Sequence, residues 1–377
     1  MPKSLKSMIF DSFSTHMNDT LYLHCLNLFP KFGPKRLLVL VNFFNSCKEA
    51  FSAPVSELCA AGISRDIAEQ FSMFRASIVP DKEQEILSSL GIDLLGLGHI
   101  NYPQLLAEIP DPPVLLYYRG SLPAPDAIML AAIGTRKITT YGRSIVPQII
   151  SPLVSAGIIV VSGMAYGVDA LVHTQAVEKR RPTIAVLGSG LDEKSVYPKE
   201  HALLADEIIS AGGCLLSEYA PGTPGFKQNF IARNRIIAGL AIGTLVIECS
   251  LKSGSLITAH YALEQNRRVY AVPGHIYAHE SQGPNNLLKM GAQPVTEAAD
   301  ILQDLNIAPE LEPEATLAAT TPTEAILIGI LTRSPLSSDE LVKLTGLETS
   351  AVSTALSFLE MRGTIKNVGA QQYIRIR

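Results

Sequence analysis

Six short apolar runs between residues 128 and 272 constrain the fold of this chain more than any other feature. They are rich in Ile and Val, and longer helical patterns separate them: Ile128–Ile133, Ile158–Val161, Thr183–Leu187, Cys214–Leu216, Leu245–Ile247 and Val269–Val272. Strands that are apolar on both sides are typical of a parallel sheet with both faces covered, and parallel strands need helical crossovers. We therefore predict an α/β fold, with an extended Rossmann-like parallel sheet over residues 81–305.

The segment before this region has a helical pattern, and we predict a helical domain of the SAM or helix-hairpin-helix type over residues 1–80. Apolar periodicity is interrupted at the turn Pro30–Pro34 and again at Gly62. A glycine-containing turn between two helices can offer backbone N–H groups to a phosphate, but a plain packing domain has the same pattern. Both interpretations stay open.

The segment after it divides into a linker and a small domain. Residues 303–322 contain four acidic residues, three prolines and no Lys or Arg, and we place a solvated linker at 306–322. Residues 323–377 are predicted to form a winged-helix domain, with helices at 324–331, 338–345 and 349–362 and a β-ribbon at 364–376. The third helix is poor in Arg and Asn, so reading of the DNA major groove is not expected.

Composition limits the classes of protein that remain. The net charge of −4 neither favours nor excludes a nucleic-acid partner, because a local basic groove can form on an acidic protein. The five cysteines are scattered and form no CxxC pair, which is typical of reduced thiols rather than of disulfides or a zinc site. There is neither a secretory leader pattern nor an apolar stretch of about 18 residues, so we expect a cytoplasmic protein.

Four loops at the expected carboxyl ends of the strands carry residues that suit a polyanion. Glycines allow close approach of the backbone to a ligand, and cations and helix N-termini attract phosphate. An aromatic ring adds a surface on which a base can stack, which is the composition of a single-strand site. The candidate residues are Gly134, Thr135 and Arg136 in the first loop, Ser162 and Gly163 in the second, Lys227, Phe230, Arg233 and Asn234 in the third, and Lys252 and Gly254 in the fourth.

Other motifs in the same region are less convincing. The stretch Gly188–Ser195 resembles a P-loop, but Glu193 replaces the glycine that must precede the lysine. Asp169 and His173 could form an acid/base pair, although a helix-capping Asp and a packed His are the simpler roles. His275 and His279 have no evident third ligand, so no metal is expected.

Several of these segments together resemble the DNA-processing A (DprA/Smf) family. SGMAYGVD (162–169) is similar to that family's SGxAxGID signature, and RNRIIAGLA (233–241), KSGSLITA (252–259) and Val272-Pro273-Gly274 resemble further family segments. YPQLLAEIPDPPVLLYYRG (102–120) resembles the lead-in to the family's central domain. One difference is Ile231, which stands where the family usually has a proline. A proline fixes the backbone at the start of a helix, so its replacement could loosen the presentation of Phe230.

The resemblance implies a sequence-independent single-stranded DNA binding protein without catalytic residues or a cofactor. It implies that the protein protects incoming DNA and loads RecA recombinase during natural transformation, with RecA and single-strand-binding protein as partners. It also implies a homodimer, formed through the central domain.

Two other functions use the same features. A Rossmann-like enzyme could hydrolyse nucleoside monophosphates with Glu218 or Glu248 as the acid/base, although KSGS after the strand differs from the loop that such enzymes use. Alternatively, the winged helix could dock a protein partner, which would make the chain an adaptor. The adaptor function is compatible with DNA binding.

Overall fold

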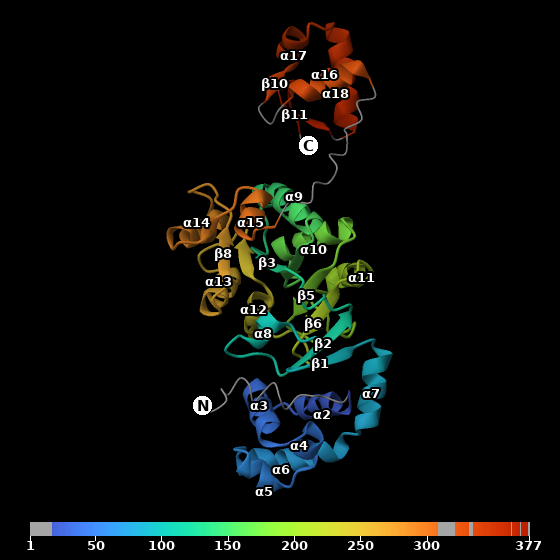
Figure 1. Cartoon of the computed structure of the whole chain (residues 1–377), viewed down its shortest axis with the longest axis vertical. Helices are drawn as coiled ribbons and strands as arrows, with labels where there is room; N and C mark the ends of the chain where they lie inside the picture. The colour runs from blue at the N-terminus through green and yellow to red at the C-terminus, as the bar shows by residue number, and fades with distance from the viewer. Residues whose placement is uncertain (1–16, 308–320, 332–334, 363, 370, 376–377) are drawn as a thin grey trace. The chain divides into compact units, whose positions relative to one another are not determined.

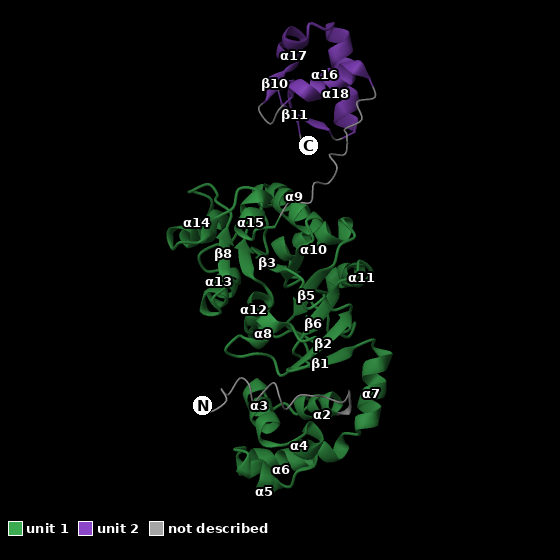
Figure 2. Cartoon of the chain, in the orientation of Figure 1, with its two compact units in different colours: residues 1–309 green, residues 310–377 purple. Residues whose placement is uncertain are grey.

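The computed structural model describes residues 17–307, 321–331, 335–362, 364–369 and 371–375. It contains two compact units, residues 1–309 and residues 310–377 (Figure 2). Most of the predicted linker, residues 308–320, lies outside the described residues, as do the first 16 residues of the predicted helical domain and the end of the predicted ribbon. In the described parts of both units, no helix is both long and apolar enough to cross a bilayer.

A nine-stranded sheet forms the centre of the first unit, in the order β1-β2-β6-β5-β4-β3-β7-β8-β9. The strands from β3 to β9 all run parallel to one another. All six predicted runs form strands, and the predicted α/β fold with a parallel sheet is confirmed. The parallel strands are β3 (Met129–Ile133), β4 (Ile159–Ser162), β5 (Thr183–Leu187), β6 (Cys214–Ser217), β7 (Gly243–Val246), β8 (Arg268–Ala271) and β9 (Gln293–Pro294).

Two further strands extend the sheet at its β6 edge. Strand β2 (Leu115–Gly120) pairs antiparallel with β6, and β1 (Asp93–Gly96) pairs antiparallel with β2. These strands were not among the predicted runs. They lie between the parallel sheet and the N-terminal helices, as Figure 1 shows.

Helices cover both faces of the sheet, as the apolar strands require. Along β3, Leu130 and Ala132 join one core with helices α9, α10 and α15, whereas Met129, Ala131 and Ile133 join another with α8, α12, α13 and α14. The bounds are α8 (Gln104–Ala107), α9 (Thr140–Ser155), α10 (Val168–Glu178), α11 (Ala202–Ser210), α12 (Lys227–Leu240), α13 (Gly254–Glu264), α14 (Gln282–Lys289) and α15 (Ala298–Asp304), with 3-10 turns η2 (Lys199–His201) and η3 (His279–Ser281).

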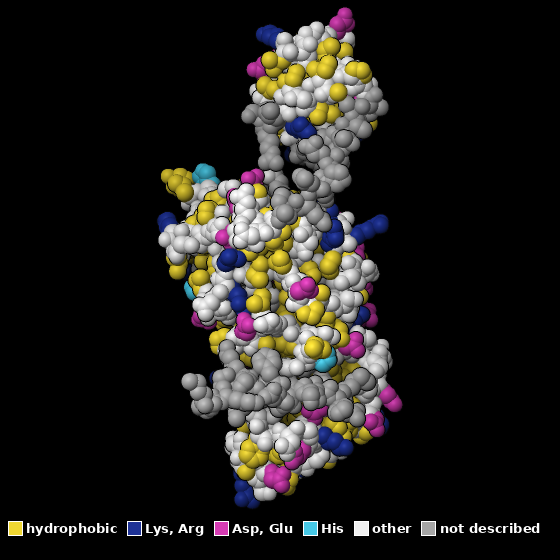
Figure 3. Space-filling model, viewed as in Figure 1, with side chains coloured by type: hydrophobic (Ala, Val, Ile, Leu, Met, Phe, Trp, Pro, Cys, Tyr) yellow, Lys and Arg dark blue, Asp and Glu magenta, His cyan; other side chains and the backbone are white. Residues whose placement is uncertain are grey.

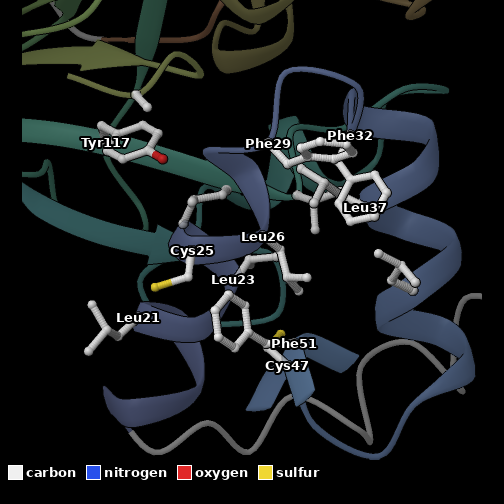
Figure 4. Packing of buried hydrophobic residues seen from close by; sticks show 14 of the residues in the cluster. Leu21, Leu23, Cys25, Leu26, Phe29, Phe32, Leu37, Cys47, Phe51 and Tyr117 are labelled. Atoms are coloured by element: carbon white, nitrogen blue, oxygen red, sulfur yellow. The ribbon is translucent and has the colours of Figure 1, made fainter. Parts of the chain in front are cut away.

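The N-terminal helices pack around a third core that reaches into the sheet. Phe29, Phe32 and Leu37 pack at the turn between α2 and α3 (Figure 4). Tyr117 of β2 enters this core, where its hydroxyl accepts a hydrogen bond from Asn27 Nδ2 at 3.0 Å. The helices are α2 (Met17–Asn27), α3 (Pro34–Phe43), α4 (Cys47–Ser52), α5 (Val55–Ala60), α6 (Arg65–Phe74) and α7 (Pro80–Ser89), with the 3-10 turn η1 (Arg75–Ser77).

The described residues of the second unit form a small core of their own, which includes Leu327, Leu341 and Leu356. A three-stranded sheet in the order β10-β12-β11 packs with three helices. The elements are α16 (Pro322–Ile330), β10 (Leu336–Ser337), α17 (Ser338–Thr345), α18 (Thr349–Met361), β11 (Ile365–Gly369) and β12 (Gln372–Arg375). The three helices and the final ribbon follow one another as predicted, whereas the short strand β10 between the first two helices was not predicted.

Candidate nucleic-acid interface

The order of the strands identifies one place in the sheet where a ligand is expected. From β3 the chain continues through β4, β5 and β6 in one direction, and from β7 through β8 and β9 in the other. The loops after β3 and β7 therefore diverge on opposite sides of the sheet, and ligands of such sheets bind in the crevice between them. Several hydrogen bonds connect these loops; among them, Thr135 N–H donates to Glu248 O at 2.6 Å, and the Ser255 hydroxyl donates to Gly134 O at 2.7 Å.

A groove of about 790 Å³ lies at this position. Its lining draws on all four candidate loops, the second through Ala165 and Asp169, and on Tyr197 from a further connection. Nine of the eleven candidate residues line it: Gly134, Thr135, Arg136, Lys227, Phe230, Arg233, Asn234, Lys252 and Gly254. The other two, Ser162 and Gly163, belong to β4 and the loop directly after it.

The Phe230 side chain is half-buried and lines this groove, so it is not enclosed in the hydrophobic core. The guanidinium carbon of Arg136 lies 5.9 Å from the centre of its ring, and the Tyr197 ring lies 5.3 Å away, centre to centre. A methyl group at Gly188 or Gly225 would come within 2.7 Å of the ring. Because both positions are glycine, the backbone of each segment can pack directly against the Phe230 ring.

The cations of the groove are at its surface. Arg136, Lys227 and Lys252 are exposed, and they come from three different strand-to-helix connections. Asn234, one turn beyond Phe230 on α12, donates from Nδ2 to Gly254 O at 3.4 Å and so links the third and fourth loops. Cations around a half-exposed ring form a surface suited to phosphates and a base together.

Basic and acidic side chains are otherwise interspersed on the face of the molecule that Figure 3 shows. This is consistent with the net charge of −4, which carries no information about the partner. The groove is therefore distinguished by the local grouping of its cations.

Arg233 has a different environment from the other cations. Its side chain is buried, and Nη1 donates to the carbonyl oxygens of Gly163, at 3.0 Å, and of Val186. Burial lowers the pKa of this guanidinium to about 10, while the nearby Asp169 opposes that shift. Arg233 thus supports the floor of the groove. Its sequence context had suggested an exposed side chain that contacts phosphate.

Two residues of the second loop support the same floor. The Ser162 hydroxyl is buried and donates to Ala132 O at 2.6 Å. A methyl group on Gly163 would lie within 2.7–2.8 Å of the Arg233 guanidinium, so only glycine leaves room for that side chain. Gly163 therefore leaves room for Arg233, whereas Ser162 ties β4 to β3, and neither residue lies in the lining of the groove.

The Asp169 and His173 side chains have structural roles. Asp169 is in the first turn of α10, whose N-cap is Gly167, and its carboxylate accepts from the Gly163 N–H at 3.2 Å. His173 is fully buried against the Thr183 hydroxyl at 2.8 Å, and burial lowers its pKa to about 3. Asp169 is therefore not the N-cap of α10 that was expected, and its carboxylate binds the preceding loop instead.

Helix α12 begins at Lys227, so Ile231 is already inside the helix. The ring of Phe230, one residue earlier, is held by Arg136, Tyr197 and the two glycines. The expected loosening at this position is thus opposed by the contacts of the ring with these four residues.

The carboxylates considered for an enzymatic function are both engaged in structural contacts. Glu218 is half-buried, and both of its oxygens accept from Arg235 Nη2 at 2.7 Å. Glu248 is buried and accepts from the backbone N–H of Thr139, at 3.1 Å, and from its hydroxyl. Neither residue lines the groove. Among the residues described, no cluster of His, Cys, Asp and Glu could hold a metal ion.

Sequence analysis missed Tyr197 as part of the site. It lies in the loop that was considered only as a P-loop, and its ring is exposed to 43% beside Phe230. The Tyr197-Pro198 pair could have marked an extended turn there. Its proximity to Phe230 depends on the fold.

The fold and the groove together define a Rossmann-like protein with a basic, ring-containing groove at its switch point. Two family models match the chain: "DNA recombination-mediator protein A" over residues 93–306 and "DprA winged helix domain" over residues 311–371. The chain belongs to this DprA/Smf family, as the resemblance predicted.

Curated relatives named Protein Smf match the chain over different lengths. The protein from Escherichia coli is 42% identical over 213 residues, which are 56% of each chain, so the match spans little more than half of that relative. The protein from Synechocystis is 32% identical, and the match covers 91% of this chain and 95% of the relative.

Two solved structures are also similar. DNA processing protein A from Streptococcus pneumoniae has a TM-score of 0.65 at 32% identity, covering 76% of this chain and 98% of that one. DNA processing protein A from Helicobacter pylori, whose structure is described in terms of its single-stranded DNA binding mode, has a TM-score of 0.52 at 31% identity, covering 58% of this chain and 97% of that one.

Proposed function

We propose that the groove at the switch point binds single-stranded DNA without sequence preference. The observation that carries this proposal is the placement of Arg136 over the Phe230 ring, in one groove with Lys227 and Lys252. Stacking on a ring is possible for every base, and cations recognise the phosphates that all sequences share. The Helicobacter relative, for which single-strand binding is stated, supports the same function here.

The candidate residues have two kinds of role in this proposal. Arg136, Lys227 and Lys252 contact phosphates, Phe230 stacks on a base, and Thr135, Asn234 and Gly254 line the path between them. Ser162, Gly163 and Arg233 act indirectly, because they hold the floor on which Phe230 and the first loop rest. No bond is made or broken in this function, and no cofactor takes part.

At the level of the cell, we infer that the protein protects incoming single strands and passes them to RecA recombinase during natural transformation. Family membership supports this role. The further partners in this proposal are single-strand-binding protein and a second copy of the chain. Co-precipitation with purified RecA, with and without a bound strand, tests the handover. A lack of RecA contact in both states would remove this part of the proposal and leave DNA binding intact.

The experiment that tests the DNA-binding proposal compares single-stranded and duplex oligonucleotides over a salt series. We expect stronger binding of the single strand, because a duplex hides its bases from the Phe230 ring. We also expect log K to fall linearly with log salt as counterions are released. Equal binding of both DNA forms would contradict the proposal.

The winged-helix unit has a core of its own, and we propose that it serves as a docking module. Removal of residues 320–377 should therefore leave the affinity for single strands unchanged within about twofold. A large loss of affinity in the truncated chain would instead make this unit part of the DNA site.

A further inference from the structure

A second groove, larger than the first, lies on the other side of helix α12. It has a volume of about 1170 Å³ and is bounded by the turn between α2 and α3, the loop before β2 and the segment 218–226. Helix α12 is the common wall: Lys227, Phe230 and Asn234 face the first groove, and Phe226, Asn229 and Arg235 border the second. Residues three or four positions apart share a helix face, which explains this division.

The ridge between the two grooves is the start of α12. Pro224 and Phe226 border the second groove, while Gly225 and Lys227 line the first. Phe226 has extended backbone angles, in which successive residues point to opposite sides. No side chain caps the helix at this point, so N–H groups of its first turn are available to an anion that crosses the ridge.

The second groove has the same kinds of side chain as the first. Phe226 is exposed to 50%, and Lys35 and Arg36 are exposed on the α3 side. Arg235 is 6% exposed, and its Nη1 has no hydrogen-bond partner in the described part of the chain. Two carboxylates also border the groove. Glu218 is bound by Arg235, and Asp111 lies 3.4 Å from Arg235 Nε, so the two carboxylates share one guanidinium. With Lys35 and Arg36, the described lining of the groove has three cations and two carboxylates.

We propose that a single strand bound in the first groove crosses the start of α12 and continues into the second. There Lys35 and Arg36 contact phosphates, and Phe226 stacks on a base. The inference rests on the proposed function, because the second groove is the continuation of the first site. It assigns a DNA-contacting role to the turn between α2 and α3, which sequence analysis left open between phosphate binding and simple packing.

The test uses the full chain and two lengths of oligo-dT, about 6 and about 16 nucleotides, which lie within the range of about 4–16 nucleotides that one single-strand domain covers. In the Lys35→Gln/Arg36→Gln variant we expect unchanged affinity for the short strand. For the long strand, the slope of log K against log salt should fall by about 1.4, which corresponds to two lost phosphate contacts. Phe226→Ala should lower the affinity for the long strand about tenfold, in line with the loss of one stacked base. Lys289→Gln, a neutralised exposed lysine of α14, is the matched control.

The outcomes separate this inference from the proposed function. If the wild-type protein binds both lengths and neither variant changes the binding of the long strand, the second groove is not part of the path and the inference is overturned. If the wild-type protein binds neither length, the proposed function itself fails. Photo-cross-linking of iodouracil placed along the long strand gives an independent reading. Cross-links to the peptide that contains Phe226 or Lys35 are expected, and their absence at every position of the strand would contradict the inference.

Discussion

Arg136 and Phe230 belong to different strand-to-helix connections, yet the guanidinium carbon lies 5.9 Å from the centre of the ring. Arg136 follows β3, whereas Phe230 is in the first turns of α12, which follows β6. The fold thus sets a positive charge beside an aromatic surface at one edge of the sheet. This relationship is what makes the groove suitable for a chain of phosphates and bases.

The ring of Phe230 should be the main stacking surface. Phe230→Leu keeps an apolar side chain between Gly188 and Gly225 but removes the ring, and we expect it to weaken single-strand binding by about 1–3 kcal/mol. Fluorescence anisotropy with labelled oligo-dT measures the effect. Thermal unfolding serves as the control, because the substitution should leave the core intact. A leucine variant with wild-type affinity would show that the ring does not stack on a base.

Gly163 should be essential for packing, whereas Gly254 should not. Gly163→Ala places a methyl group within 2.7–2.8 Å of the Arg233 guanidinium, and overpacking of this kind costs about 1–3 kcal/mol of stability. At Gly254 no atom lies within 4 Å of the added carbon, so Gly254→Ala should stay within about 0.5 kcal/mol of wild type. Urea unfolding of the two variants checks the difference, and equal stability would argue against the placement of Arg233.

Arg233 and Asp169 should depend on each other. Burial raises the pKa of the Asp169 carboxyl and the Arg233 charge opposes that rise, so Arg233→Met should raise this pKa further and lower the stability of the fold. The double variant with Asp169→Asn should recover part of this loss. A double-mutant cycle by chemical unfolding measures the coupling. Additive effects of the two substitutions would mean that the charges do not interact.

The buried His173 should make the first unit sensitive to acid. Its folded-state pKa is lowered to about 3 by burial, against about 6.5 in an unfolded chain, so the unfolded state binds the proton first as the pH falls. Stability should therefore decline as the pH falls from about 6.5, by about 2 kcal/mol at pH 5. His173→Gln should remove this contribution, while His260→Gln, at an exposed position, should leave it unchanged. Unfolding curves between pH 5 and pH 7.5 make the comparison, and an unaltered pH profile in the His173 variant would exclude this residue as the source.

The strands and the loops of the site could be predicted from the sequence because each depends on local pattern. The apolar runs give β3 to β8 almost residue by residue, and glycines and cations after them indicate the site. The added strands β1 and β2 were missed, since Leu115–Gly120 ends in Tyr, Arg and Gly and lacks an apolar pattern throughout. The order of the strands, which places the switch point between β3 and β7, is a property of the whole chain.

Burial separates residues that look alike in sequence. Arg136 and Arg233 both appear as cations in glycine-containing or polar segments, but α12 turns Arg233 toward Gly163 and Val186, whereas Arg136 is left at the surface. Which side chains of a helix point toward the edge of the sheet depends on tertiary packing. For the same reason the sequence did not indicate that Tyr197 lies beside Phe230.

The most direct test of the account is the salt dependence of single-strand binding in Arg136→Gln, Lys227→Gln and the double variant. Each lost phosphate contact should lower the affinity and reduce the slope of log K against log salt by about 0.7, and the double variant by about 1.4. Arg143→Gln, an exposed cation of α9 that does not line the groove, should behave as wild type. A double variant that binds as tightly as wild type, with the same slope, would contradict the assignment of this groove to DNA.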